Sequence, residues 1–343
     1  DWLVNTANFW LFTFRDLTRA IAWVIELPYQ FLRKLLIEGF QTGYGDAAVQ
    51  LAPSLSWIAV IATAMAIGHY ARDWALSLLV GACFLYLAVF GQWDSAMITL
   101  ASVLVAVPIG AAGGLALGVL AYRHPWVETL LRPILDLMQT VPVFAYLVPI
   151  LILFGFGPVA ALVATVIYAM PPMIRVTIVA LKTVPEELLE AGRMMGATPR
   201  QMTWKVLVPS ATPTLMVGVN QVIMLTLNMV IIASMIGAGG LGFDVLASLR
   251  KLDIGGGIEA GLGIVVMAIA LDRASQAFAE RRATHRRGDT FVKRYPWSTT
   301  VALVIVGTFL LGLVAPGIQS YPDALKISTG QFWSNAMEWI NVN

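Results

Sequence analysis

Long apolar runs separated by short polar segments dominate this chain. The hydrocarbon core of a bilayer is about 30 Å thick, and about 20 helical residues cross it. Eight apolar runs come close to this length, and they lie near residues 53–71, 75–93, 96–121, 133–154, 158–181, 210–236, 258–278 and 297–316. The pattern therefore predicts an all-α integral membrane protein with about eight transmembrane helices.

Composition favours the same class. The 343 residues are 58% apolar and 12% charged, whereas soluble domains are roughly 45–50% apolar and about 25% charged. The net charge of +2 is too small to indicate a nucleic-acid partner. Cys83 is the only cysteine, which excludes a disulfide framework or a cysteine metal cluster within one chain. The chain starts at Asp1 without a signal-peptide pattern, so we expect the natural start to lie upstream.

The segment before the first apolar run has a different pattern. Residues 9–40 place apolar side chains at helical spacing, with charged residues such as Arg19 and Glu26 between them. This pattern is typical of helices that lie in the plane of the membrane interface, and a solvated cap packed on the bundle fits it equally well. We therefore expect residues 1–52 to form an external N-terminal region and residues 53–94 a peripheral pair of spans.

Basic residues indicate which loops face the cytoplasm, because short cytoplasmic loops carry an excess of lysine and arginine. Segment 281–296 is the most basic of the loops, and the loops two and four spans earlier are basic as well. The basic residues of the two earlier loops are Lys182, Arg193, Arg200 and Lys205, and Arg123, His124 and Arg132. With eight spans, both ends of the chain are then predicted to face outward.

Residues 183–209 form a polar insert between the fifth and sixth runs. Thr183 to Glu186 has the spacing of a capping box, which predicts a short helix that runs to about Met195. Gly196 can close this helix in the left-handed conformation. Thr198 and Pro199 then start a second short helix, which we expect to end at Pro209. The predicted result is a cytoplasmic helix-turn-helix hairpin, and a plain solvated loop is the alternative.

This insert carries a family resemblance. Glu190-Ala191-Gly192, followed by Gly196 and by Val206 to Pro209, resembles the EAA loop of binding-protein-dependent ABC importer permeases. Gly192 stands where the family has a second alanine, and Val208 stands where it has leucine. Downstream, GVNQVIMLTLNMVIIASMIGAGGLG and LDRASQA resemble the glycine betaine/proline branch. The resemblance covers residues 95–280.

The resemblance implies a type I ABC importer-like fold, with a permease core at 95–280 and a coupling loop at 183–209. That loop would seat in a groove of a cytoplasmic ABC ATPase, which works as a dimer. The residues that the resemblance assigns to this contact are Glu187, Glu190, Ala191, Gly192, Arg193, Gly196 and Arg200.

The resemblance also implies partners and a substrate class. We expect an external substrate-binding protein, location in a bacterial inner membrane, and a small methylated amine such as glycine betaine, choline, proline betaine or trimethylamine N-oxide as substrate. No lysine follows a glycine in this chain, so it lacks the loop that holds nucleotide phosphates. We therefore expect no cofactor in this chain, with ATP and magnesium bound by the partner ATPase.

Polar residues inside the apolar runs are candidates for a translocation path, since such groups usually face a bundle interior or water. They are Gln139, Asn220, Gln221 and Asn228, and hydrogen bonding between helices is the alternative role. An ion-coupled secondary transporter would instead need acids at membrane depth. Asp136 and Glu259 are the candidates for that alternative. An importer for an unrelated small solute also remains open.

Two further patterns concern packing and assembly. Gly110, Gly114 and Gly118 share one helix face, which predicts a close helix contact. The tail at 317–343 follows the extra span at 297–316, and its Phe332-Trp333 resembles Phe9-Trp10. We expect the permease to pair either with a second copy of itself or with a fused second module that starts at this tail.

Overall fold

The structure is a computed structural model that describes residues 8–9, 12–42, 49–280, 302, 304–309 and 321–342. Helices dominate these residues. Two short antiparallel hairpins are the only strands among them: β1 (Asn8–Phe9) pairs with β2 (Phe12–Thr13), and β3 (Phe40–Thr42) pairs with β4 (Val49–Ala52). The predicted all-α class is confirmed.

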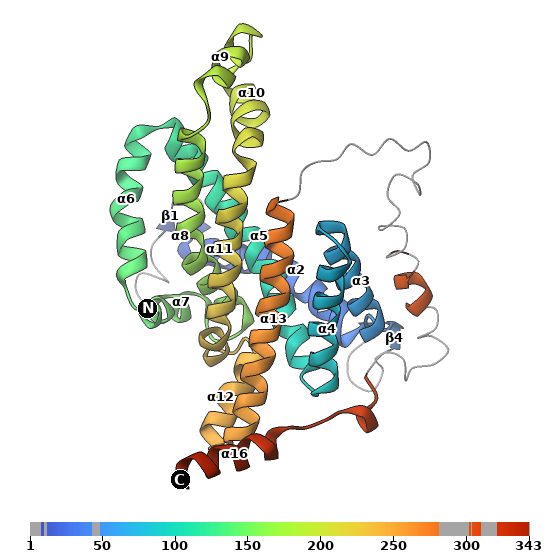
Figure 1. Ribbon diagram of the computed structural model, residues 1–343. Helices are drawn as coiled ribbons and strands as arrows, with labels where there is room; N and C mark the ends of the chain where they lie inside the picture. The colour runs from blue at the N-terminus through green and yellow to red at the C-terminus, as the bar shows by residue number, and fades with distance from the viewer. Residues whose placement is uncertain are drawn as a thin grey trace.

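Within the described residues, four helices are long and apolar enough to cross a bilayer. They are α5 (Trp93–Arg123), α8 (Pro158–Lys182), the helix that ends as α11 (Val208–Met235), and α13 (Ile254–Glu280). They coincide with the third, fifth, sixth and seventh predicted runs. In Figure 1 they form the centre of the molecule, with α12 (Leu241–Lys251) between the ends of α11 and α13.

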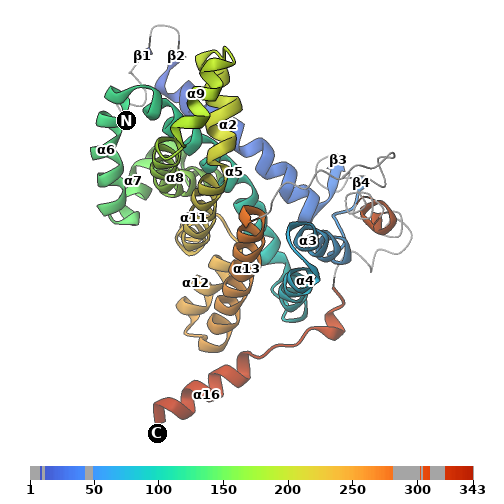
Figure 2. The ribbon, with the colours of Figure 1, turned by 45° about the horizontal axis from the view of Figure 1, so that its top comes forward.

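The first two predicted spans are helical but short. α3 (Trp57–Ala71) and α4 (Trp74–Val89) have 15 and 16 residues, fewer than the roughly 20 that a straight crossing needs. The backbone N–H of Leu76 donates to the Asp73 carboxylate at 2.9 Å, which caps α4. This pair lies on one side of the central helices (Figure 2).

The fourth predicted span is broken rather than continuous. α6 (Pro125–Thr140) and α7 (Val143–Phe154) meet at an angle of 105°. Val141, the residue before Pro142, has extended backbone angles, because a proline disfavours the helical conformation of its predecessor. The prediction of one helix over 133–154 was therefore wrong. Because the pair could be one broken span, and because most of 297–316 lies outside the described residues, the count of eight stays a prediction.

The N-terminal region contains one long helix, α2 (Phe14–Arg33), followed by the π-helical turn η1 (Lys34–Glu38). α2 runs obliquely across the bundle in both views (Figures 1 and 2). Its buried Ile25 and Tyr29 face the core, while Val24 and Leu27 are exposed. The helix thus packs on the bundle as a cap would, and it also presents the exposed apolar face of an interfacial helix.

Hydrogen bonds join the C-terminal segment to the end of the bundle that carries α12. The 3-10 turn η5 (Asp323–Leu325) leads to α16 (Gly330–Val342). The buried Glu259 carboxylate of α13 accepts hydrogen bonds from the backbone N–H and the hydroxyl of Thr329. The N–H of Ile327 donates to the Val89 carbonyl at 2.8 Å. The basic segment 281–296, which set the predicted orientation, lies outside the described residues.

The glycines of α5 allow a very close approach of α8. A Cβ added to Gly118 would lie 2.5 Å from the Thr177 Cβ and 3.0 Å from the Ile174 carbonyl oxygen. A Cβ on Gly114 would lie 2.6 Å from the Met173 Cβ. Real Cβ atoms do not come this near to other atoms, so only glycine fits here.

Gly118→Ala should therefore destabilise the membrane domain by about 1–3 kcal/mol, the usual cost of overpacking a well-filled core. Thermal unfolding of the detergent-solubilised protein measures this as a lower midpoint. Gly261→Ala is the matched control, because a Cβ on this α13 glycine meets no atom of a described residue within 4 Å. Equal midpoints for the two variants would contradict the close α5–α8 contact.

Candidate coupling hairpin and translocation pocket

The polar insert folds as a helical hairpin that projects beyond the bundle (Figure 1). Its first arm is α9 (Glu186–Met194) and its second arm begins with α10 (Pro199–Gln201). Gly196 closes α9 with a φ of +73°. The N–H of Gly196 donates to the Arg193 carbonyl at 2.9 Å, and that of Ala197 donates to the Gly192 carbonyl at 3.0 Å. These two bonds make the Schellman motif that favours glycine, and they confirm the predicted left-handed turn.

The capping box lies at a different place from the predicted one. Thr183 does not cap α9, because it ends α8 and its hydroxyl donates to the Ala180 carbonyl at 3.1 Å. Thr198 caps the second arm instead. Its hydroxyl accepts from the N–H of Gln201 at 3.3 Å, and its own N–H donates to the Gln201 side chain at 2.9 Å. Glutamine serves as well as glutamate in this exchange.

The second arm continues into the membrane without a break. Pro209 does not end a short helix, as the sequence pattern predicted. The π-helical segment η3 (Met202–Leu207) joins α10 to α11, so one helix of 37 residues runs from Pro199 to Met235. Pro209 has no N–H to donate, and the π-helical hydrogen-bond pattern of η3 comes just before it in the continuous helix. A displacement of the hairpin therefore acts directly on α11.

The hairpin has an inner and an outer face. Gly192 is buried, and a Cβ there would lie 2.8 Å from the Met202 Cε, so this glycine lets α9 pack against η3. It therefore does not lie on the outer face. The exposed members of the predicted docking set are Glu187, Glu190, Ala191, Arg193, Gly196 and Arg200, and the charged ones form no ion pair with any residue that the structure describes.

Two methionines at the tip were missed by the sequence reasoning. Met194 and Met195 are 89% and 80% exposed. Methionine is flexible and polarizable, and it is common on surfaces that bind other proteins. Consecutive apolar residues at the end of a polar helix, just before its closing glycine, were the signal that could have identified them. Their role, like that of the charged residues, stays a prediction.

Polar contacts tie the base of the hairpin to the α5–α6 junction. The Arg123 guanidinium donates to the Pro199 carbonyl at 2.8 Å. The Glu128 carboxylate accepts from Lys182, the last residue of α8, at 2.7 Å, and from Arg132 at 2.7 Å. These contacts place the first two predicted basic loops on one side of the bundle.

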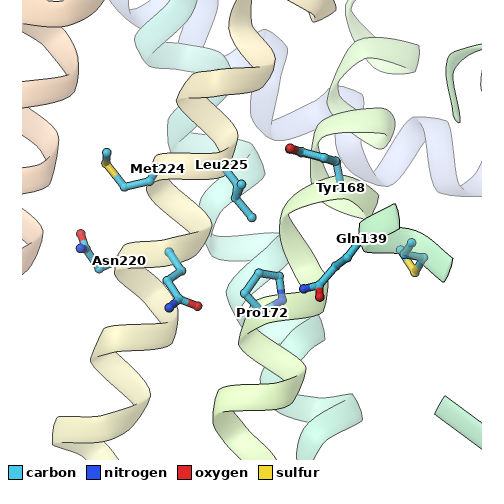
Figure 3. Close-up of a pocket in the computed structure, with 8 residues that line it drawn as sticks. Gln139, Tyr168, Pro172, Asn220, Met224 and Leu225 are labelled. Atoms are coloured by element: carbon cyan, nitrogen blue, oxygen red, sulfur yellow. The ribbon is translucent and has the colours of Figure 1, made fainter. Parts of the chain in front are cut away.

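A pocket of about 380 Å³ opens between α6, α8 and α11. Its lining residues are Met138, Gln139, Tyr168, Pro172, Asn220, Gln221, Met224 and Leu225 (Figure 3). Tyr168 and Leu225 lie across it from one another, while Asn220 and Met224 lie on the side of α11 away from α8 (Figure 3).

Three of the four predicted path residues thus come together at this pocket. Gln139, Asn220 and Gln221 line it, whereas Asn228 is exposed and lies outside it, two helical turns further along α11. The Asn220 side-chain oxygen is buried, and no residue in the described part of the chain gives it a hydrogen bond. Such a group favours a polar ligand or water at this position.

An ion pair joins α6 to α8 next to the pocket. The Arg175 guanidinium lies 2.6 Å from the Asp136 carboxylate. Asp136 was predicted as a candidate acid at membrane depth. Its partner could not be predicted, because the two residues are 39 positions apart and only the packing of α6 on α8 brings them together.

Comparison with known proteins identifies the family. The family described as "Binding-protein-dependent transport system inner membrane component" has a model that matches residues 110–284. The chain belongs to this family. It is therefore an inner membrane component of a transport system, and the matched region contains the hairpin and the pocket.

Three curated relatives are informative. The chain is 38% identical over 343 residues to the trimethylamine N-oxide transport system permease protein TmoV of Pelagibacter ubique, a match that covers 95% of this chain and 47% of TmoV. It is 51% identical over 199 residues to the glycine betaine/proline betaine transport system permease protein ProW of Escherichia coli, covering 58% of this chain and 56% of ProW.

The third relative matches over most of its own length. The glycine betaine transport system permease protein OpuAB of Bacillus subtilis is 43% identical over 240 residues, which cover 70% of this chain and 82% of OpuAB. By contrast, the chain spans only about half the length of TmoV and of ProW.

Replacing Gly196 tests the closure of the hairpin. A left-handed conformation costs a residue with a side chain about 1–2 kcal/mol, so Gly196→Ala should raise the hydrogen-exchange rate of the Ala197 amide by a factor of about 5–30. Gly196→Asn is the control, because asparagine tolerates this conformation better, and it should give a smaller increase. A rate unchanged by alanine would show that the turn is not the observed one.

Proposed function

We propose that this chain is the permease subunit of an ATP-driven importer for a small methylated amine or related compatible solute. The observation that carries the proposal is the projecting hairpin of a chain in this permease family. Its outer face has the charges of Glu190, Arg193 and Arg200, which form no ion pair with a described residue, and the exposed apolar tip of Met194 and Met195. Such a surface suits docking to another protein.

The hairpin is connected to the pocket along two routes. The first is the continuous helix 199–235, whose Asn220 lines the pocket about 20 residues from the hairpin. The second runs through Lys182 and Glu128 into α6, which carries Gln139. A push on the hairpin can therefore shift two walls of the pocket together.

In the proposed cycle, ATP draws two cytoplasmic ATPase subunits together, and each carries one hairpin with it. The spans then rock between inward-open and outward-open arrangements. A second permease unit is needed for the second hairpin, either another copy of this chain or a fused module. ATP and magnesium are bound by the ATPase, and an external binding protein delivers the solute to the permease in the bacterial inner membrane.

Three observations support the substrate class. Relatives are named as permeases for trimethylamine N-oxide, glycine betaine and proline betaine. The pocket of about 380 Å³ is within the usual size range for small-molecule sites. Tyr168 lines the same pocket as the amides of Gln139 and Gln221, and an aromatic face attracts a quaternary ammonium group.

Both acids that an ion-coupled secondary transporter would use have other partners. Asp136 pairs with Arg175, and Glu259, near the start of α13, accepts hydrogen bonds from Thr329. The engagement of both carboxylates favours the ATP-driven function over this alternative.

The direct test is reconstitution of the permease with its ATPase and external binding protein in proteoliposomes. Methylated amines should stimulate ATP hydrolysis, and their uptake should require ATP. Uptake that follows an ion gradient without the ATPase would instead identify a secondary transporter. ATP-driven uptake of some other small solute, with no response to methylated amines, would retain the importer and overturn the substrate class.

Charge reversal at Glu190 tests the docking role of the hairpin. Reversing a charge that contacts a partner commonly costs about 2 kcal/mol or more, so Glu190→Lys should lower ATP-driven uptake by about tenfold or more while the membrane domain stays folded. Glu338→Lys is the matched control, since Glu338 is an exposed acid on α16 at the opposite end of the molecule. Uptake at the wild-type rate in both variants would contradict the docking role.

A further inference from the structure

The ion pair between Asp136 and Arg175 joins α6 to α8 of the membrane domain. Arg175 precedes Lys182, the end of α8, by seven residues, which is about 10 Å along a helix. Charged groups at such depth are costly and usually mark a functional site. We therefore looked for a functional role of this ion pair.

The pair borders the pocket on the side of the hairpin. On α6, Asp136 comes one helical turn before Gln139, and on α8, Arg175 comes one turn after Pro172. Gln139 and Pro172 both line the pocket. A solute that leaves the pocket toward the hairpin would meet these two charges next.

Holding α6 and α8 together does not account for this ion pair. Glu128 and Lys182 already join the same two helices, and Glu128 is well covered, with 14% of its side chain exposed. Val127 and Leu135 of α6 pack with Ile178 of α8 in a small apolar cluster. The Asp136 and Arg175 side chains, by contrast, are 67% and 42% exposed.

The pair also retains unused binding capacity. One guanidinium nitrogen, Nη2, bonds to one carboxylate oxygen of Asp136, while Nε of Arg175 is buried and has no hydrogen-bond partner among the described residues. A guanidinium group has five N–H donors and can hold an anionic oxygen with two of them. The site can therefore take a second anionic group.

We propose that Asp136 and Arg175 form a site for a small zwitterion at the hairpin side of the pocket, which rests on the proposed function. The anionic oxygen of the solute binds the Arg175 guanidinium, and its alkylated ammonium group lies against the Asp136 carboxylate. Opposite charges within one small solute match opposite charges within one ion pair.

The physical advantage is that neutrality is kept at every stage. Without solute the two side chains neutralise each other, and with solute each has a partner on the solute. No bare charge is left at membrane depth, where an unpaired charge is strongly unfavourable. A cation without an anionic oxygen would leave Arg175 unpaired, and a lone carboxylate would leave Asp136 unpaired. The site thus discriminates zwitterions and strong dipoles from simple ions.

Protection of an introduced cysteine from modification tests the proposal. Gln139→Cys in a Cys83→Ala background supplies the only thiol of this chain, and the permease is assembled with its ATPase in nanodiscs without the binding protein. Glycine betaine at twice its Kd should slow modification of this thiol by a maleimide about threefold, the factor given by mass action. Choline and acetate should give little protection.

The controls separate binding from structure. Asn228→Cys, exposed on α11 outside the pocket, should not be protected. Asp136→Asn and Arg175→Gln should each abolish protection of the thiol introduced by Gln139→Cys. Where either fails to fold, Asp136→Glu and Arg175→Lys keep the charge but alter the geometry and should weaken protection. Protection that survives in all variants that fold, or equal protection by choline, would overturn the proposal.

Failure of this inference is distinguishable from failure of the proposed function. ATP-driven uptake of glycine betaine by the Cys83→Ala parent reports on the function alone. If that parent transports glycine betaine while the introduced thiol is never protected, the zwitterion site is wrong and the importer stands. If no methylated amine is transported, the substrate class itself is wrong.

Discussion

The close contact of α5 with α8 is the constraint on which the other features depend. Met173 and Thr177 of α8 lie against the glycine seam of α5. At 100° per residue, the opposite stripe of α8 contains Tyr168, Pro172, Arg175 and Lys182. The seam thus fixes which side of α8 faces α6 and the pocket. A side chain at Gly114 or Gly118 would move this whole stripe, with the ion pairs that it makes.

The same contact gives the hairpin a firm base. α8 ends at Lys182, held by Glu128, and the second arm starts at Pro199, held by Arg123. Both arms are therefore anchored on the same junction, between α5 and α6. The charges on the outer face of the hairpin form no ion pair within the described residues. They are therefore available to pair with charges on a partner protein. In the proposed function, the hairpin acts as a lever, and its movement is passed on to the continuous helix 199–235.

Much of this architecture could be predicted from the sequence, and the failures have physical reasons. The long apolar runs, the left-handed turn at Gly196 and the two-armed hairpin depend on local chemistry, which the sequence states directly. The bend at Val141 follows from Pro142, but its size depends on how α7 packs. The helix end predicted at Pro209 was wrong because the helix continues past this proline through a π-helical turn. The cap predicted at Thr183 was wrong because its hydroxyl donates to a carbonyl at the end of α8.

The site was harder to predict than the fold. Gln139, Asn220 and Gln221 were selected as polar residues in apolar runs, and the structure brings them to one pocket. The residues near them, Tyr168 and Arg175, could not be predicted. Nothing in the sequence distinguishes these two residues, and only the packing of α6 against α8 brings them to the site. The role of Gly192 also depended on packing: next to Glu190 it looked like an outer residue, but contact with Met202 places it inside the hairpin.

The most direct test of this account measures the side of the membrane from which the tip of the hairpin can be modified, and whether the ATPase blocks that modification. With Met195→Cys in a Cys83→Ala background, a membrane-impermeant maleimide is applied to inside-out and right-side-out vesicles. We expect modification only in inside-out vesicles, and protection when the purified ATPase subunit is added. Modification in right-side-out vesicles, or no protection by the ATPase, would contradict the docking of this hairpin to a cytoplasmic ATPase.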